Sequence, residues 1–233
     1  MFYLVFLSVF TIFAPNYMIS PRLIRKEMRK FKNWMKAAIL TLCGTSVLAS
    51  CSNEDNPADK KGQLLEVYNV KGSEATARLT INGEVLFTTP VFVGKNGIGK
   101  TREGDSKTPT GILHVVKAFG VKAKPEGCKF DYIDVTPTIY ACDDDCEWYN
   151  QIIDLSKVKH DCKGEDMYNL VPQYNYGLTT DYNAECDHEK GSNIFIHCKG
   201  YKPYTGGCIS FDEDKMIEIL RRCDTSLIVK ISE

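Results

Sequence analysis

Apolar and polar residues alternate along most of the chain between residues 64 and 93. Residues 64–70, 76–81 and 84–93 are each predicted to form a strand with one buried face. Asn82-Gly83, between the second and third of these segments, is typical of a two-residue hairpin turn, because both residue types tolerate a positive φ. Residues 111–119 are predicted to form the next strand. The pattern therefore favours a mainly β domain.

The pattern is less regular between residues 120 and 190, which are polar, aromatic and rich in cysteine. Residues 132–140 are predicted to form a strand that Pro137 interrupts. In this stretch the sequence indicates individual elements but no continuous period.

A helical period returns near the C-terminal end. One apolar face is formed by Met216, Ile219 and Leu220. Ser210 and Glu213 have the spacing of a capping box, so we expect the helix to begin there and to cover residues 212–222. Residues 226–232 are predicted to form a final strand, at the edge or in the core.

The stretch before this helix carries the candidate chemistry. A short apolar run ends in His197, and Thr205, Gly206 and Gly207 then lead to Cys208. An imidazole and a helix N-terminus both lower the pKa of a nearby thiol, so this order predicts a nucleophile. The N–H groups of Gly207 and Cys208 are expected to face an oxyanion. The alternative is a buried histidine and a cysteine in a glycine-rich turn.

These residues resemble the catalytic motif of the L,D-transpeptidase catalytic domain family (YkuD-type), which has a histidine at a strand end followed by Ser/Thr-x-Gly-Cys. Residues 105–113, DSKTPTGIL, resemble the K-T-P-T-G turn of the same family. The resemblance covers residues 64–233. It implies an α+β, mainly β fold, a β-sandwich or mixed sheet with a few helices, a C-terminal helix and a final strand.

The resemblance implies cysteine-dependent acyl transfer on peptidoglycan stem peptides, with Cys208 as nucleophile and His197 as base. It implies that Thr205, Gly206 and Gly207 form the loop at the oxyanion, and that no metal and no cofactor take part. The thioester then passes to an amine, which cross-links or anchors, or to water. The alternatives are an L,D-endopeptidase of the same fold and an inactive envelope-binding lipoprotein.

Two positions depart from the commonest family motif, S-H-G-C-x-R. Gly206 replaces its histidine, and Ser210 replaces the arginine that is expected to hold an acidic group of the substrate. The sequence is closer to a branch with Thr-x-Gly-Cys, and the acyl acceptor stays open. In that branch further residues are expected near the substrate, although the pattern alone favours a strand with surface aromatics: Tyr176, Tyr182, Asn183 and Lys199.

The N-terminal region predicts export. Residues 28–50 have a basic and then a short apolar segment, and with Cys51 they fit a lipoprotein signal peptide followed by a polar tether over residues 51–63. We therefore expect a periplasmic lipoprotein held in the membrane by a lipid on Cys51. Residues 1–27 are either a second membrane segment or, as we favour, a mis-called extension. The net charge of −1 argues against nucleic acid as a partner.

Ten cysteines suit an exported chain that uses disulfides. We expect a disulfide between Cys142 and Cys146, around an acidic loop, and another between Cys162 and Cys186. The pairs His160-x-Cys162 and Cys186-x-His188 also contain zinc-ligand residue types, but the spacing is tighter than in usual structural sites. They leave a zinc-dependent hydrolase as a further alternative. A disulfide between Cys198 and Cys208 would switch the enzyme off.

Overall fold

The computed structural model describes residues 62–161 and 164–233. The predictions for the extension, the signal peptide, lipidation of Cys51 and most of the tether lie outside the described residues, as does Cys162. Within the described part, no helix is long and apolar enough to cross a membrane.

Three antiparallel strands begin the fold: β1 (Gln63–Lys71), β2 (Glu74–Ile81) and β3 (Glu84–Phe92). They follow the predicted alternation, since Ala75, Ala77 and Leu79 of β2 are buried while their neighbours are not. Asn82 and Gly83 have φ of 52° and 84°, so the predicted hairpin turn is confirmed.

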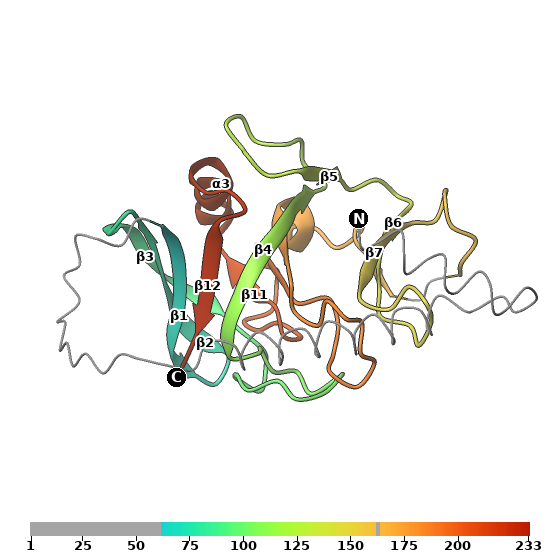
Figure 1. Ribbon diagram of the computed structural model, residues 1–233, viewed down its shortest axis with the longest axis horizontal. Helices are drawn as coiled ribbons and strands as arrows, with labels where there is room; N and C mark the ends of the chain where they lie inside the picture. Colours follow the sequence, from blue (N-terminus) through green and yellow to red (C-terminus); the bar gives the residue numbers. More distant parts are fainter. Residues whose placement is uncertain (1–61, 162–163) are drawn as a thin grey trace, which may run out of the picture. The chain divides into compact units, whose positions relative to one another are not determined.

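A mixed sheet continues from this meander and closes on itself. It contains β4 (Gly111–Gly120), β9 (Gly177–Thr180), β10 (Phe195–Cys198), β11 (Ile209–Phe211) and β12 (Leu227–Ile231). Among the described strands the order is β12-β1-β2-β3-β11-β10-β9-β4, and β4 pairs back to β12. We call this closed sheet the ring. The final strand is therefore interior, parallel to β1 and antiparallel to β4, as the adjacent ribbons in Figure 1 illustrate.

Helix α3 (Glu213–Arg222) packs its apolar face on the main core. The predicted residues Met216, Ile219 and Leu220 are fully buried in that core. The capping-box prediction is wrong, because Asp212 is the N-cap and Ser210 lies in β11, where it pairs with His197 and Phe92. The ladder bonds of the sheet thus extend β11 into the segment where we expected the helix to begin.

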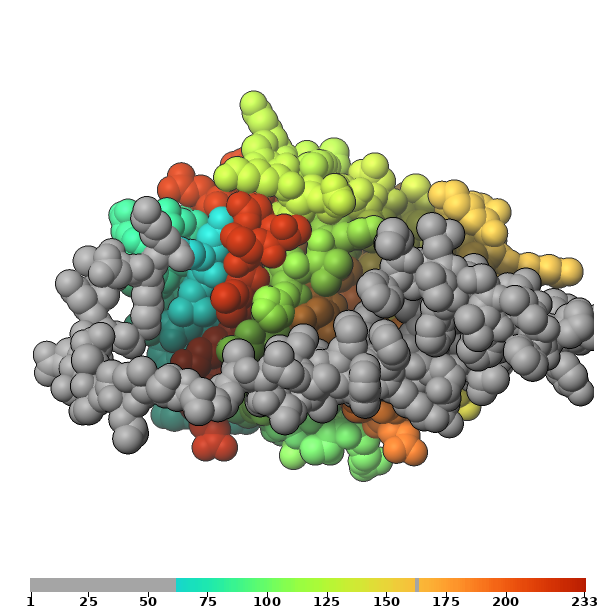
Figure 2. Space-filling model, viewed as in Figure 1, coloured from blue at the N-terminus to red at the C-terminus, as the bar shows by residue number. Residues whose placement is uncertain are grey.

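A second sheet lies beyond the ring at the end of β4 far from β3 (Figure 1). It has the order β7-β6-β8 and contains β6 (Ile139–Cys142), β7 (Gln151–Asp154) and β8 (Glu165–Asp166). We call it the small sheet. The single broken strand predicted over 132–140 is two strands in different sheets, because β5 (Tyr132–Asp134) pairs in parallel with β4 instead. The loop between β4 and β5 stands out from the surface in Figure 2.

The predicted fold class is confirmed: the described chain is mainly β, with a mixed sheet, a C-terminal helix and a final strand. The 3-10 turn η2 (Gln173–Asn175) contacts β10 and β4 and brings Tyr174 to the outer side of the ring.

Candidate active site

Two parallel strands place His197 and Cys208 on one face. Ile196 of β10 pairs with Ile209 of β11, and both side chains lie in the main core. Because side chains alternate along a strand, His197 and Cys208 point to the opposite face. There they line a cavity of about 480 Å³. Both residues of the sequence-predicted pair therefore line the same cavity on the outer side of the ring, each with its own backbone hydrogen-bond partners.

Only one ring nitrogen of His197 is available to a substrate or a thiol. Nδ1 lies 2.7 Å from the carbonyl oxygen of Cys198, and a carbonyl can only accept, so Nδ1 carries the hydrogen. Burial lowers the pKa of His197 to about 4, against a smaller opposing effect of this hydrogen bond. At neutral pH the imidazole is therefore uncharged, and its Nε2 presents a lone pair.

The Cys208 thiol is protonated in this structure. Its Sγ donates to the carbonyl oxygen of Asn193 at 3.1 Å and accepts from the N–H of Phe195 at 3.3 Å. Burial and the charge of Glu165 raise its pKa to about 12, although the Phe195 N–H and Lys100 act in the other direction.

The predicted activation of this thiol by a helix N-terminus is wrong. Helix α3 begins at Glu213, and β11 separates it from Cys208. The expectation that the pKa of the Cys208 thiol is lowered is also wrong. Burial raises this pKa, and no helix N-terminus lies at the thiol to lower it.

Two threonine hydroxyls fix the main chain at Cys208. Thr205 Oγ1 donates to the Cys208 carbonyl oxygen at 2.6 Å, and Thr108 Oγ1 lies 3.3 Å from the same oxygen. Thr108 also accepts from the Gly94 N–H at 2.8 Å. The turn at 105–113 therefore lies beside the loop that carries Cys208, and both threonines hold Cys208 in place.

The glycines before Cys208 have different roles from each other. Gly207 has φ of 152°, and a Cβ there would lie 2.9 Å from the Lys107 carbonyl oxygen, so the position requires glycine. Its N–H donates to Thr205 Oγ1 at 3.1 Å, which contradicts our expectation that it faces an oxyanion in this state. A Cβ on Gly206 would meet nothing within 4 Å, so this residue leaves the cavity mouth open.

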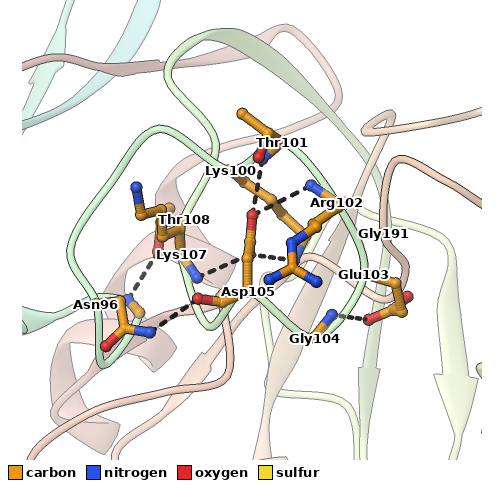
Figure 3. A network of polar contacts seen from close by, with 12 residues as sticks. Asn96, Lys100, Thr101, Arg102, Glu103, Gly104, Asp105, Lys107, Thr108 and Gly191 are labelled. Carbon is orange, nitrogen blue, oxygen red and sulfur yellow. Dashed lines mark hydrogen bonds and ion pairs between the residues drawn. The ribbon is translucent and has the colours of Figure 1, made fainter.

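A network around Asp105 holds the loop that enters the cavity (Figure 3). The Asp105 carboxylate accepts from the N–H groups of Thr101, Arg102 and Lys107 at 2.7, 3.1 and 3.0 Å. Lys100 Nζ lies 3.0 Å from it, with both side chains almost entirely buried. Burial opposes ionisation of Asp105, but these donors outweigh it and hold its pKa well below the usual range.

Another wall is formed by Tyr174, which sequence reasoning did not assign to the site, and by Glu165, which begins the Glu-x-Met segment that the family resemblance places near it. The Tyr174 ring meets the His197 ring edge-on, with centroids 5.4 Å apart and an interplanar angle of 88°. Its hydroxyl donates to Glu165 of β8. Burial raises the pKa values of both groups, and the hydrogen bond partly offsets this for Glu165. Glu165-Asp166-Met167-Tyr168 precedes η2 in the sequence, but nothing in that pattern reveals the contact.

Asn193 and Glu103 were also missed. The Asn193 side-chain amide lines the cavity and is buried, and its oxygen and nitrogen find no partner among the described residues. Glu103 accepts from Tyr149 and Ser192, each at 2.7 Å. Burial pushes the pKa of Glu103 upward, but these bonds outweigh it and lower the pKa. Asn193 has φ of 51°, a backbone state that no sequence pattern revealed.

The four further residues predicted to touch substrate do not line the cavity. Tyr176 is buried at the main core, and the Tyr182 hydroxyl donates to the Lys190 carbonyl oxygen at 2.8 Å. Asn183 Nδ2 donates to the carbonyl oxygens of Asp187 and Gly191, each at 2.8 Å. Lys199 forms an ion pair with Asp212 at 2.9 Å. Each side chain serves the fold instead.

The predicted disulfides are not found among the described cysteines. Cys142 Sγ and Cys146 Sγ are 3.6 Å apart, which is too far for an S–S bond. Cys198 and Cys208 are both thiols, and Cys198 Sγ donates to the Tyr176 carbonyl oxygen at 3.5 Å. The Cys162–Cys186 prediction involves a residue outside the described part. His188 stacks on Tyr149 and lies 2.5 Å from Asp145.

Comparison with known proteins gives a family match. The sequence profile of YkuD, the L,D-transpeptidase catalytic domain, matches residues 67–231. A search of the curated proteins found no match.

Two solved structures are similar over part of their length. The helical cell shape determining protein Pgp2 from Campylobacter jejuni shares 14% identity with a TM-score of 0.41, over 75% of this chain and 49% of that chain. The Ldtfm-avibactam carbamoyl enzyme shares 12% identity with a TM-score of 0.39, over 75% and 50%. This chain thus spans about half the length of either structure.

Proposed function

This chain belongs to the L,D-transpeptidase catalytic domain family, and from that premise we propose that it is a cysteine acyltransferase acting on peptidoglycan stem peptides. The observation that carries the proposal is the placement of Cys208 and the Nδ1-protonated His197 on one face, in the wall of one cavity. A fold that used these residues only for packing would not need both to border solvent-accessible space.

The reaction starts from a neutral pair. As Cys208 Sγ attacks the carbonyl carbon of the donor residue, its proton passes to Nε2 of His197. The tetrahedral intermediate collapses when the C–N bond breaks, and the imidazolium returns the proton to the departing amine. A thioester on Cys208 remains. An acceptor amine then attacks the thioester carbonyl, gives its proton to His197 and releases the thiol.

The oxyanion needs a donor near Cys208. The N–H of Cys208 is the first candidate. Thr205 and Thr108 hold the carbonyl oxygen of the same residue, which keeps the main chain at Cys208 in a fixed orientation. The Gly207 N–H becomes a second donor only when it leaves Thr205 Oγ1. We therefore assign to Thr205 the role of holding this loop until substrate enters.

The cavity wall suits a peptide that carries both amine and carboxylate groups, as does the meso-diaminopimelate expected from the family. Glu103, Asp143 and Glu165 line it and attract an ammonium group. Lys100 and Lys202 line it as well and provide positive charge. The unpartnered amide of Asn193 can both donate to and accept from a peptide bond.

Export is a separate part of the proposal. The basic and apolar composition of residues 28–50, followed by Cys51, supports a lipoprotein signal and attachment to a membrane of the cell envelope. Residues 1–27 are then an extension upstream of the true start. Mass spectrometry of the membrane-extracted protein tests both points, since a diacylated Cys51 at the N-terminus is expected and an unprocessed chain would contradict them.

A labelling experiment tests the acyl transfer. The full chain, incubated with a carbapenem-type acylating agent, is expected to gain one adduct on Cys208, detected by intact-protein and peptide mass spectrometry. Cys208→Ala should abolish the adduct. Cys128→Ala removes a buried thiol outside the cavity and should leave it intact. Labelling of Cys208→Ala at the wild-type rate would refute the assignment.

Product analysis separates transfer from cleavage. With a disaccharide tetrapeptide and an added amine, transfer gives a cross-linked or amine-capped product, whereas an L,D-endopeptidase gives only the trimmed peptide. Binding without any new product, together with no adduct on Cys208, would support the inactive envelope-binding alternative.

A further inference from the structure

Three side chains of the small sheet and its loops lie close together at a place separate from His197 and Cys208. Cys142 ends β6, Cys146 follows in the next loop, and His160 comes from the segment after β7. The Sγ atoms of Cys142 and Cys146 are 3.6 Å apart. His160 Nε2 is 3.7 Å from the first sulfur and 3.5 Å from the second. The three ligand-type atoms thus form a nearly equilateral triangle.

These distances fit the edges of a zinc tetrahedron. With Zn–S bonds of about 2.3 Å and a Zn–N bond of about 2.05 Å, tetrahedral angles give S···S of about 3.8 Å and S···N of about 3.6 Å. A disulfide would instead need an S–S distance of about 2.05 Å. The spacing Cys-x-x-x-Cys also lies within the usual range for structural zinc.

The surroundings favour metal-bound thiolates. Cys142 is fully buried and Cys146 partly so, and the Trp148 N–H donates to Cys146 Sγ at 3.3 Å. A backbone N–H pointing at sulfur stabilises its charged form. Asp144 Oδ2 lies 3.3 Å from His160 Nε2, the nitrogen that would bind the ion, so this carboxylate is close enough to take the fourth position after a rotation.

We propose that Cys142, Cys146 and His160 bind a zinc ion with a structural role. On binding, the two thiols lose their protons to solvent and the neutral imidazole contributes the lone pair of Nε2, so that the two thiolates balance the charge of the ion. No oxidation or reduction is involved. The proposal is independent of the acyltransfer reaction, because none of the three residues lines the cavity.

The ion would fasten the part of the small sheet that supports the cavity wall. β6 carries Cys142 and pairs with β8 through Ala141 and Glu165. Asp143, the residue after Cys142, lines the cavity with Glu165. Gly164 packs so closely that a Cβ would lie 2.3 Å from the Ala141 carbonyl oxygen. Among the described residues, the cluster around Cys142 has only one other buried member, Ile153, so a metal bound there adds cohesion that this cluster lacks.

Metal analysis of the purified full chain tests the proposal. Expression with added zinc, without chelators in purification, should yield about one zinc per chain by inductively coupled plasma mass spectrometry. Cys146→Ala and His160→Ala should lose it. Two matched controls, Cys128→Ala and His114→Ala, remove a cysteine and a histidine outside the cluster and should retain it.

A second measurement covers the case in which the ligand variants do not fold. Cobalt exchanged into the wild-type protein should give tetrahedral d–d bands and a thiolate-to-cobalt charge-transfer band. His160→Cys keeps a ligand at this position, so it should still bind one metal ion, with a stronger charge-transfer band. The proposal is overturned if the wild type binds no zinc, if all variants keep it, or if the mass is 2 Da low with Cys142 and Cys146 joined in one peptide.

Discussion

The ring and the small sheet are held together by different forces. The ring is built on fully buried aliphatic and aromatic side chains such as Leu65, Leu79 and Phe211. The small sheet has strands of two to four residues and a separate cluster in which only Cys142 and Ile153 are buried. On β6, Ile139 and Ala141 are buried in a second cluster with Phe119 and Phe195 of the ring. Polar contacts such as Thr138 Oγ1 to Asp154 at 2.7 Å add to these. The ring is thus held by one large hydrophobic core, whereas the small sheet combines a small cluster of its own, apolar contacts with the ring, and polar and thiol contacts.

The largest expected contrast is between one histidine of each region. His197→Ala removes the proposed base and should lower the rate of Cys208 acylation by about 10²- to 10⁴-fold. His160→Ala acts only on the support of the cavity wall and should lower that rate by less than about tenfold. Stopped-flow or mass-spectrometric acylation rates of both variants provide the measurement. Equal losses of rate in both variants would contradict the distinction between a base in the ring and a supporting residue in the small sheet.

The second-largest contrast is expected in how much one core substitution destabilises each region. Ile231 of β12 and Ile153 of β7 are matched isoleucines on strands, one in the main core and one in the small cluster. Ile231→Ala should lower the free energy of unfolding by about 4 kcal/mol, and Ile153→Ala by about 2 kcal/mol, because the smaller cluster can collapse around the gap. Urea denaturation followed by circular dichroism, and by Trp148 fluorescence for the small sheet, measures both. A greater loss for Ile153→Ala would reverse the comparison.

The pH dependence of acylation should be set by His197 and Cys208, whose pKa values are shifted chiefly by burial. Burial lowers the pKa of His197 to about 4 and raises that of Cys208 to about 12. The base is therefore lost only as pH falls through about 4, and the rate should drop about tenfold for each further unit. Between pH 5 and 10 the rate should be flat, since the thiol stays protonated. The same profile is expected for Cys146→Ala, and a rise through neutral pH would indicate a thiolate–imidazolium pair instead.

The smallest effect is expected where the two regions meet. Tyr174→Phe removes the hydroxyl that donates to Glu165, but keeps the ring against His197. The buried carboxylate loses a partner, which should lower the acylation rate by about threefold to tenfold through a shift of the wall. Tyr176→Phe is the control, since Tyr176 does not line the cavity. An unchanged rate in Tyr174→Phe would show that the small sheet does not influence the chemistry.

The sequence predicted the ring better than the small sheet for a physical reason. Alternation is visible in strands of eight to ten residues, so β2, β3 and β4 were located within two residues, as was α3 by its apolar face. β8 has two residues and β11 has three, which is too short for any period. The turn between β2 and β3 was found because its φ angles demand particular residue types.

The candidate site likewise contains residues that the sequence predicted and residues that it did not. That His197 and Cys208 line one cavity could be expected, because a motif in one short stretch carries both residues. Lys100, Asn193 and Tyr174 reach the cavity from separate segments, and only tertiary packing brings them there. The thiol pKa was predicted in the wrong direction, because burial is a property of the assembled fold and not of local spacing.

The position of β12 between β1 and β4 has a consequence for how the protein is made. A ribosome delivers the polypeptide from its N-terminal end, so one edge of β1 stays unpaired until Leu227–Ile231 emerges. The nascent chain therefore cannot complete its ring until this last strand is available. During that interval the edges of β1 and β4 that pair with β12 stay exposed to other strands.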